Sequence, residues 1–269
     1  ANSATAHTIT VTITDANDQA PSWTTSATAS VAEGATAVAT MAATDSDTAD
    51  SNGLTYSITT NDPSGTVFAV SGTALTMTAQ NYESPACGAD SDSLTCVVVL
   101  AATDAANSAT AHTITVTITD ANDNTPIFAD GGTASASVEE GATTAGTYAA
   151  TDADGTSAHN TITYSNSGGA DTALFAVDSS TGALTFSTAP DYDSGSACAA
   201  GNSCVVELTA TSGSLTDTIT VTVAITDAND QAPTYSGGDV TPSVAEGTTA
   251  VDSFTVVDTD SGDVNTCAL

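Results

Sequence analysis

Strict alternation between apolar residues and threonine marks three segments of the chain. Residues 8–14 and residues 113–119 both read TITVTIT, and residues 218–226 read TITVTVAIT. Because successive side chains of a β-strand point to opposite faces, the isoleucines and valines of these segments would face a core and the threonines would face solvent. The pattern predicts a half-buried β-strand in each segment.

Shorter apolar segments, separated by Gly, Asn, Asp and Ser, predict further strands, and no segment has a convincing helical period. Roughly seven short strands in about a hundred residues are typical of an antiparallel β-sandwich. We therefore predict an all-β chain of tandem seven-stranded Greek-key β-sandwich repeats. The additional strands are predicted at residues 54–60, 74–78, 97–102, 161–165, 183–187 and 205–210.

A seven-residue phrase follows each alternating segment: DANDQAP at residues 15–21, DANDNTP at residues 120–126, and DANDQAP at residues 227–233. Each copy carries two carboxylates and an amide and ends in proline, so we interpret it as an acidic, metal-binding linker between repeats. Partial repeats at both ends lead us to expect a segment of a longer array. The predicted division is residues 1–19 for the last strand and linker of a preceding repeat, 20–124 and 125–231 for two complete repeats, and 232–269 for part of a further repeat.

The charge balance restricts the possible partners. The chain has 32 Asp and Glu residues and no Lys or Arg, so its carboxylates can be neutralised only by protons, salt or bound cations. Nucleic acids and anionic membrane surfaces would be repelled. Because apolar residues reach 40% and charged residues only 12%, with clear strand patterning, we predict a folded chain rather than a disordered one.

Four of the five cysteines occupy matching positions in the two complete repeats. Cys87 and Cys96 follow an acidic segment in the first repeat, as Cys198 and Cys204 do in the second. We expect two local disulfides, each stabilising the fold by roughly 2–3 kcal/mol, and an oxidising extracellular setting; free or metal-bound thiols are the alternative. Cys267 is expected to pair with a cysteine outside this sequence.

Separate acidic motifs recur in a fixed order in each repeat. VAEG or VEEG comes first, followed by TDSD, TDAD or VDTD, then NYES or DYDS, and finally the linker phrase, which has the form DxNDxxP. Over essentially the whole chain, this set resembles the motifs of the extracellular cadherin repeat. The resemblance implies cadherin-like β-sandwiches joined by calcium-binding linkers, at the surface of a cell.

The resemblance also implies which residues bind the metal. Each junction would gather ligands from one repeat, the linker and the next repeat around two to three Ca²⁺ ions, which prefer six to eight oxygen ligands. Backbone carbonyls of Ala121, Asn124 and Asn160 would complete the middle junction. The predicted ligands are Asp15, Asn17, Asp18, Asp45, Asp47 and Asp104 at the first junction; Glu33, Glu83, Asp120, Asn122, Asp123, Asp152 and Asp154 at the middle junction; and Glu140, Asp191, Asp193, Asp227, Asn229, Asp230, Asp258 and Asp260 at the third junction.

Three positions depart from the family pattern. Asn81 stands where an Asp is usual, Asp193 replaces the usual Glu, and Ser212 takes the place that Asp104 has in the first complete repeat. Asn81 removes one charge from the outer site of the middle junction, and the shorter side chain of Asp193 reduces bidentate reach at the third junction. With Ser212 in place of an Asp, we expect weaker binding at the site of the middle junction nearest the second complete repeat. The competing interpretation is that the acidic motifs are solvated turns, since Asp and Asn favour turns.

Aromatic and histidine residues have simpler interpretations. Trp23, Phe128 and Tyr235 each follow the linker proline, and we predict that they are core aromatics of the first strand rather than adhesive anchors. The three histidines are expected at the surface, and no nucleophile motif such as GxSxG is present. We therefore do not expect an enzyme.

The leading hypothesis is a rigid extracellular rod that is part of a long cadherin-like adhesion protein, with Ca²⁺ clamping the linkers. A structural alternative is a subunit of a self-assembling extracellular filament or sheath. A third possibility is a set of spacer repeats in a secreted hydrolase. The expected partners are other repeats of the same chain, and like chains or another surface protein.

Overall fold

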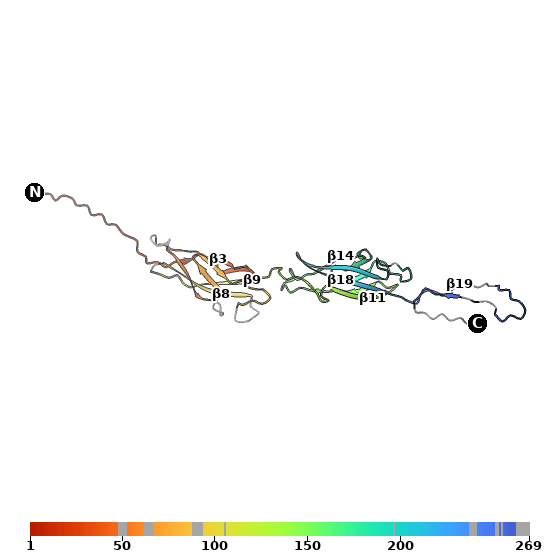
Figure 1. Cartoon of the computed structure of the whole chain (residues 1–269). Coiled ribbons are helices and arrows are strands. Elements are labelled where there is room, and N and C mark those ends of the chain that lie inside the picture. Colours follow the sequence, from red (N-terminus) through yellow and green to blue (C-terminus); the bar gives the residue numbers. More distant parts are fainter. Residues whose placement is uncertain are drawn as a thin grey trace. The chain divides into compact units, whose positions relative to one another are not determined.

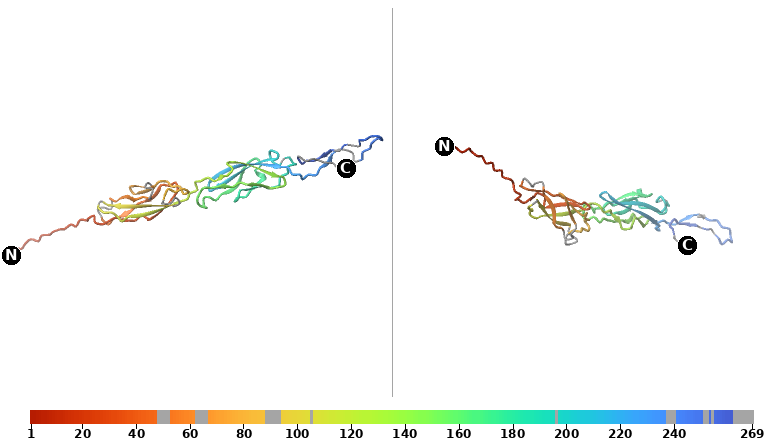
Figure 2. Two further views of the ribbon diagram at one scale, coloured as in Figure 1. Left: turned by 90° about the horizontal axis from the view of Figure 1, so that it is seen from below. Right: turned by 60° about the vertical axis from the view of Figure 1, so that its left-hand side comes forward.

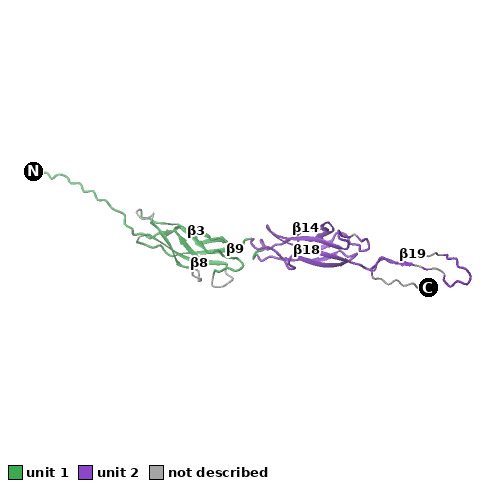
Figure 3. Ribbon diagram, viewed as in Figure 1, with its two compact units in different colours: residues 1–121, 154–156 green, residues 122–153, 157–269 purple. Residues whose placement is uncertain are grey.

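The computed structural model describes residues 1–47, 53–61, 67–87, 94–104, 106–195, 197–236, 241–250, 253 and 255–261. The chain divides into two compact units (Figure 3). Unit 1 comprises residues 1–121 and 154–156, and unit 2 comprises residues 122–153 and 157–269. The boundaries predicted for the individual repeats stay a prediction.

Unit 1 contains two main sheets (Figure 1). The larger sheet pairs its strands in the order β2-β9-β8-β5, and β2 runs parallel to β9 whereas the other pairs are antiparallel. A smaller antiparallel sheet has the order β3-β7-β6, and β1 pairs with β4. The strands are β1 (Ser22–Trp23), β2 (Thr28–Ala32), β3 (Ala37–Thr40), β4 (Ala43–Thr44), β5 (Thr55–Thr60), β6 (Phe68–Ser71), β7 (Ala74–Met77), β8 (Thr95–Thr103) and β9 (His112–Thr119).

Unit 2 repeats this arrangement with the sheets β11-β18-β17-β14 and β12-β16-β15 and the pair β10-β13. Strand β11 is parallel to β18, the counterpart of the parallel pair in unit 1. A short 3₁₀ helix, η1 (Thr172–Leu174), precedes β15, and β19 (Thr234–Ser236) pairs with β20 (Thr255–Val257) near the end of the chain. The other strands are β10 (Ile127–Phe128), β11 (Thr133–Glu139), β12 (Thr144–Thr147), β13 (Ala150–Thr151), β14 (Thr163–Gly168), β15 (Phe175–Val177), β16 (Ala183–Phe186), β17 (Ser203–Ser212) and β18 (Leu215–Thr226).

The core of each unit is formed by the inward residues of alternating strands. In β9, Ile114, Val116 and Ile118 are buried while the intervening threonines are not, as the sequence pattern predicted. Residues from both sheets of a unit belong to one core cluster, such as Leu100 of β8 and Leu75 of β7 in unit 1. The all-β sandwich prediction is therefore confirmed, and Figure 2 shows the same arrangement from two further directions.

One predicted strand is wrong. Residues 8–14 have no strand structure, and Ile9, Val11 and Ile13 are 78–91% exposed. The identical sequence at residues 113–119 is a strand because β2 and β8 flank it and supply its hydrogen bonds. No described strand pairs with residues 8–14. The other strand predictions coincide with β5, β7, β8, β9, β14, β16, β17 and β18 to within a few residues.

The two predicted disulfides are present, and the three aromatic residues that follow the linker prolines differ in burial. Cys87 is bonded to Cys96 and Cys198 to Cys204, whereas Cys267 lies outside the described residues. All three aromatics lie in the first strand of their repeat, and Phe128 and Trp23 contribute to the cores as predicted. Tyr235 is 71% exposed, so its core assignment is wrong for this chain.

The histidine prediction is only partly right, because His112 is half-buried and stacks on Trp23 with ring centroids 4.9 Å apart. In the described part of the chain, no helix has the length and hydropathy needed to cross a membrane.

Candidate metal centres

The glutamates of the VAEG and VEEG motifs connect distant segments of their units. Glu33 accepts backbone hydrogen bonds from Ala121 N at 2.7 Å and from Tyr82 N at 2.8 Å. Glu140 makes the equivalent pair, from Ala228 N at 2.9 Å and Tyr192 N at 2.7 Å. Both glutamates are buried. In each unit, one glutamate carboxylate therefore connects the start of a linker to the acidic segment of the NYES or DYDS motif, residues 81–83 in unit 1 and residues 191–193 in unit 2.

The second aspartate of the TDSD and VDTD motifs is buried and accepts hydrogen bonds from the later residues of a linker. Asp47 Oδ2 accepts hydrogen bonds from Asp18 N at 2.9 Å and Gln19 N at 2.8 Å. Asp260 Oδ2 accepts one from Gln231 N at 3.0 Å. Because backbone N–H groups of the linker donate to these carboxylates, the linker backbone is fixed by the same acidic motifs that we predicted to supply ligands.

In unit 1, Glu83, Asp120 and Asp154 offer carboxylate oxygens that lie within 4.8 Å of one another. Gly155 N donates to Glu83 Oε1 at 3.2 Å, and Thr156 donates to Asp120 Oδ2 from both its backbone and its hydroxyl group. Burial is the main cause that raises the pKa of Glu83, and the charges of Glu33 and Asp120 add to it. Like charges gathered in this way attract a cation.

Unit 2 contains two overlapping groups of the same kind. Glu140, Asp191 and Asp193 form one group, and Asp193, Asp230 and Asp260 form the other, each with oxygens within 4.8 Å. Burial raises the pKa of Asp193 to about 6, with further contributions from Asp260, Glu140, Asp227 and Asp230 in that order. Both carboxylate oxygens of Asp193 are buried and accept no hydrogen bond from any residue that the structure describes.

The first linker in unit 1 has a different arrangement, centred on Asp104. Its Oδ1 accepts hydrogen bonds from Asn107 N at 2.5 Å and Ala106 N at 2.6 Å, and the Asn107 bond is the main cause that lowers the pKa of Asp104. Asn107 Nδ2 also donates to Asn17 Oδ1 at 2.5 Å. Asp104 Oδ2 and Asp45 Oδ2 are buried and accept no hydrogen bond within the described ranges. These oxygens are available to a ligand.

Other predicted ligands occupy the same parts of the chain. Asp227 accepts a hydrogen bond from Ser261 N, and hydrogen bonding from the Ser261 side chain is the main cause that lowers the pKa of Asp227. Ser212, at the position of Asp104, is buried and donates to His159 O instead. Asp15 lies in unit 1, and Asn122, Asp123, Asp152, Asn229 and Asp258 lie in unit 2.

The chemistry of the donor set fits Ca²⁺. The groups in both units are made of carboxylate oxygens, the hard donors that Ca²⁺ and Mg²⁺ prefer, and they contain none of the Cys or His ligands that favour zinc. Asp193 gives the clearest support, because no described residue donates to its buried oxygens and the chain has no Lys or Arg to neutralise them. The individual ligand assignments and the number of ions stay predictions.

Sequence reasoning missed several polar residues that hold these segments in place. Asp171 is buried and accepts hydrogen bonds from Ala199 N at 2.6 Å and Val205 N at 2.8 Å, around the second disulfide. Gln80 and Asn202 connect each disulfide region to an acidic segment. Nothing in the sequence separates these residues from ordinary turn residues, because their partners lie in other segments of the fold.

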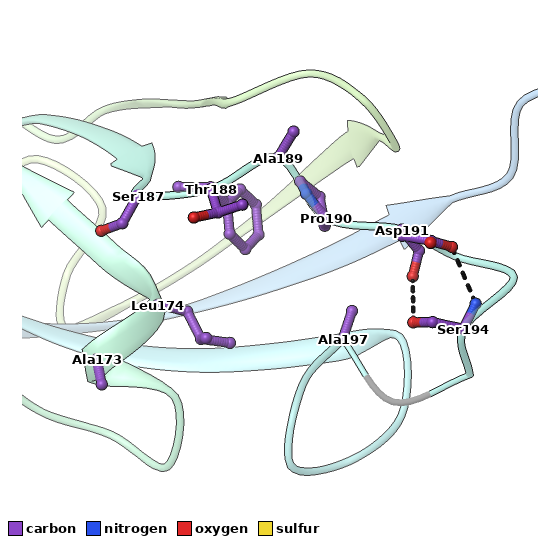
Figure 4. Close-up of a pocket in the computed structure, with 10 residues that line it drawn as sticks. Ala173, Leu174, Ser187, Thr188, Ala189, Pro190, Asp191, Ser194 and Ala197 are labelled. Carbon is purple, nitrogen blue, oxygen red and sulfur yellow. Dashed lines mark hydrogen bonds between the residues drawn. The ribbon is translucent and has the colours of Figure 1, made fainter.

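A pocket of about 230 Å³ lies beside the acidic segment of unit 2 (Figure 4). Its wall is mainly apolar and includes Leu174, Phe186 and Pro190, while Asp191 and Ser194 stand at one end. Ser194 donates to Asp191 twice, from its backbone N–H to Oδ1 and from its hydroxyl to the backbone carbonyl, each at 2.9 Å. The acidic segment therefore borders open space on this side.

The known proteins that resemble this chain in sequence or in structure are cadherins and protocadherins. No family model matches the chain. Human Protocadherin Fat 1 is 32% identical over 157 residues, which are 56% of this chain and 3% of that protein. Mouse Cadherin-23 domains EC22–24 align over 91% of this chain and 80% of that structure, with a TM-score of 0.65 and 22% identity.

The human Desmocollin-1 ectodomain aligns over 81% of this chain and 44% of that structure, with a TM-score of 0.60 and 20% identity. The chain thus spans a small part of Protocadherin Fat 1 and less than half of the Desmocollin-1 structure. The disulfides and these neighbours agree with the predicted extracellular location. The resemblance seen in the motifs is confirmed: the repeats of this chain have the fold of cadherin extracellular domains.

Proposed function

We propose that the chain is a calcium-dependent, rigid extracellular segment of a cadherin-like adhesion protein. The observation that carries the proposal is the environment of Asp193. Its two buried oxygens lack hydrogen-bond donors among the described residues, and burial, together with four other carboxylates, raises its pKa. A divalent cation would satisfy these oxygens and offset the repulsion.

The residues that would hold the ion also hold the linker. Glu140 accepts the backbone N–H of Ala228, and Asp260 accepts that of Gln231, so the carboxylates on both sides of a linker are fixed to its backbone. When bound, Ca²⁺ supplies the positive charge that lets these carboxylates stay close together. Glu140 and Asp260 would then restrict the linker between them, and without the ion their mutual repulsion would loosen it.

Small-angle X-ray scattering with calcium and with chelator tests this proposal. We expect the maximum dimension to increase and the distribution of distances to narrow when calcium is added. Magnesium at the same ionic strength is the control for simple screening, because Mg²⁺ demands a more regular octahedral shell. A scattering curve that does not respond to calcium would refute the rigid-rod proposal.

Assembly with like chains is a second candidate, supported by the composition of the larger sheet of unit 1. Strands β2, β5, β8 and β9 contain no carboxylate, although the chain carries 32. Outward residues such as Thr113, Thr117 and the 41% exposed Val97 form an uncharged surface on which two acidic chains could approach. Light scattering over a range of concentrations, with and without calcium, tests whether such assembly occurs.

A further inference from the structure

Each complete repeat places its disulfide next to its acidic segment. The acidic segments are residues 81–83 in unit 1 and residues 191–193 in unit 2, and Cys87 and Cys198 follow them closely in the chain. In each unit a side-chain amide joins the two features. The residue that supplies this amide is different in the two units.

In unit 2 the connection is made by Asn202, which lies inside the loop closed by Cys198 and Cys204. Asn202 Nδ2 donates to the backbone carbonyl of Tyr192 at 3.0 Å. The N–H of the same residue, Tyr192, donates to Glu140 Oε2 at 2.7 Å. The backbone of Tyr192 is thus held at both its N–H and its carbonyl, and Asp191 and Asp193 are its immediate neighbours.

The loop that carries Asn202 is itself firmly anchored. Cys198 and Gly201 exchange two backbone hydrogen bonds, of 2.8 and 3.1 Å, and Gly201 has a φ of 78°, which favours glycine. Asp171 accepts an N–H from each side of the loop, at Ala199 and Val205. With the disulfide, these bonds give Asn202 a fixed base from which to hold Tyr192.

In unit 1, the disulfide loop does not supply the amide that connects the disulfide to the acidic segment. Leu94 occupies the position of Asn202, because Ile118 N bonds to Leu94 O as Ile225 N bonds to Asn202 O, each at 2.8 Å. A leucine side chain cannot donate a hydrogen bond. Unit 1 therefore needs a different residue for this role.

Gln80, next to the acidic segment, supplies the amide in unit 1. Its Oε1 accepts a hydrogen bond from Ala86 N at 3.0 Å and lies 3.5 Å from Cys87 Sγ, a contact only, since a disulfide sulfur carries no hydrogen. Gln80 Nε2 donates to Thr78 O at 2.9 Å, which fixes the amide. The corresponding position in unit 2 is Pro190, whose side chain has no amide, so the two connections are independent solutions to one requirement.

Packing alone does not fix the acidic segment of unit 2. The side chain of Tyr192 packs on the core, but residues Pro190, Asp191 and Ser194 border the pocket of about 230 Å³ (Figure 4). The residues that border the pocket have fewer packing contacts there, so the position of the acidic segment depends more on its hydrogen bonds. This is the segment whose carboxylates meet Glu140, Asp230 and Asp260.

We propose that Asn202 and Gln80 are positioning residues that couple each disulfide to the carboxylates of the neighbouring acidic segment. Asn202 positions Asp191 and Asp193, and Gln80 positions Glu83. The part of the proposal that concerns calcium affinity rests on the proposed function. The part that concerns local order of the acidic segments does not need calcium.

Two variants test the proposal in a crossed design. Asn202→Leu introduces the residue of unit 1, and Gln80→Leu removes the amide from unit 1. Amide hydrogen exchange in chelator should rise about three- to tenfold at residues 191–194 in the first variant and at residues 81–87 in the second, the effect of losing one hydrogen bond. Each variant should leave the other acidic segment unchanged, and Asn202→Gln, which keeps an amide, should restore part of the protection.

Calcium titration of the same proteins adds a second readout. We expect Asn202→Leu to weaken binding at the unit 2 sites by a similar factor, with the thermal midpoint of the chelated protein little changed. A Cys198→Ser/Cys204→Ser background should remove most of the effect of Asn202→Leu, because the amide then has no fixed base. If the double-cysteine variant does not fold, the exchange measurements on the single variants decide.

Unchanged exchange at residues 191–194 in Asn202→Leu would overturn the proposal, as would a uniform increase throughout unit 2, which indicates a merely structural role. Additive effects in the cysteine background would refute the coupling to the disulfide. A wild-type chain that binds no calcium would refute the proposed function instead, and the exchange measurements would still decide the positioning role.

Discussion

The carboxylate of Glu140 and the backbone N–H of Ala228 lie 2.9 Å apart, although 88 residues separate them in the sequence. Glu33 and Ala121 form the same bond across the same separation in unit 1. In each unit, therefore, the beginning of a linker is attached to the start of the repeat before it. The other oxygen of each glutamate accepts an N–H from the acidic segment.

Glu140→Gln is expected to destabilise unit 2 even without calcium. A glutamine offers one acceptor oxygen, so one of the two N–H groups of Ala228 and Tyr192 loses its partner, at a cost of about 1–3 kcal/mol. Urea unfolding in chelator measures the change. Glu246→Gln is the matched control, because Glu246 has the same place in its VAEG motif and is exposed; equal effects of both substitutions would contradict this account.

Asp193→Asn should change stability in opposite directions with and without calcium. Burial, together with repulsion from four neighbouring carboxylates, raises the pKa of Asp193. The substitution removes the charge of Asp193 from this group, so the chelated protein should become more stable. With calcium present, a ligand is lost and the stabilisation by calcium should decrease. Thermal unfolding under both conditions measures this. A loss of stability in chelator would show that Asp193 is not strained by its neighbours.

Acidification should weaken the turn that Asp178 forms before β16. Hydrogen bonds from Ser180 and then Thr181 lower the pKa of Asp178 to about 2 from an ordinary value of 3.8. A lowered pKa means that the ionised form is favoured in the folded state. Its stabilising contribution is complete above about pH 4 and is lost as the pH falls toward 2. An NMR titration of the Asp178 carboxyl group checks this, and an ordinary value would contradict it.

Two copies of the same heptapeptide should behave differently in hydrogen exchange. Residues 113–119 lie between β2 and β8, so their amides should be strongly protected. Residues 8–14 have the same sequence, but no described strand pairs with them, and their amides should exchange at nearly the rate of an unfolded peptide. Equal protection of both segments would show that residues 8–14 pair with a strand after all.

The same alternating sequence forms a strand at one place in the chain and none at another. Alternating patterns identified β9 and β18 because a buried face imposes a period of two on the strand. The same pattern failed at residues 8–14, because a strand also needs neighbours to pair with. The order of the acidic motifs led us to expect Glu33 and Glu140 near linkers, and each accepts a hydrogen bond from a linker residue.

The supporting polar residues could not be predicted in the same way. Asn202 and Gln80 occupy different positions in their repeats, so comparing the repeats with each other hides them. Asp171 resembles an ordinary turn residue until the fold brings Ala199 and Val205 to its carboxylate. Such roles arise from contacts between distant segments, which no local pattern encodes.

Calcium binding by the whole chain can be measured by isothermal titration calorimetry. We expect saturable binding at more than one site, a strong reduction in Asp193→Asn, and release of protons near pH 6, where Asp193 is partly protonated without the ion. Absence of saturable heat, with the same thermal unfolding in calcium and in chelator, would contradict the proposed calcium dependence and leave the acidic motifs as turn residues.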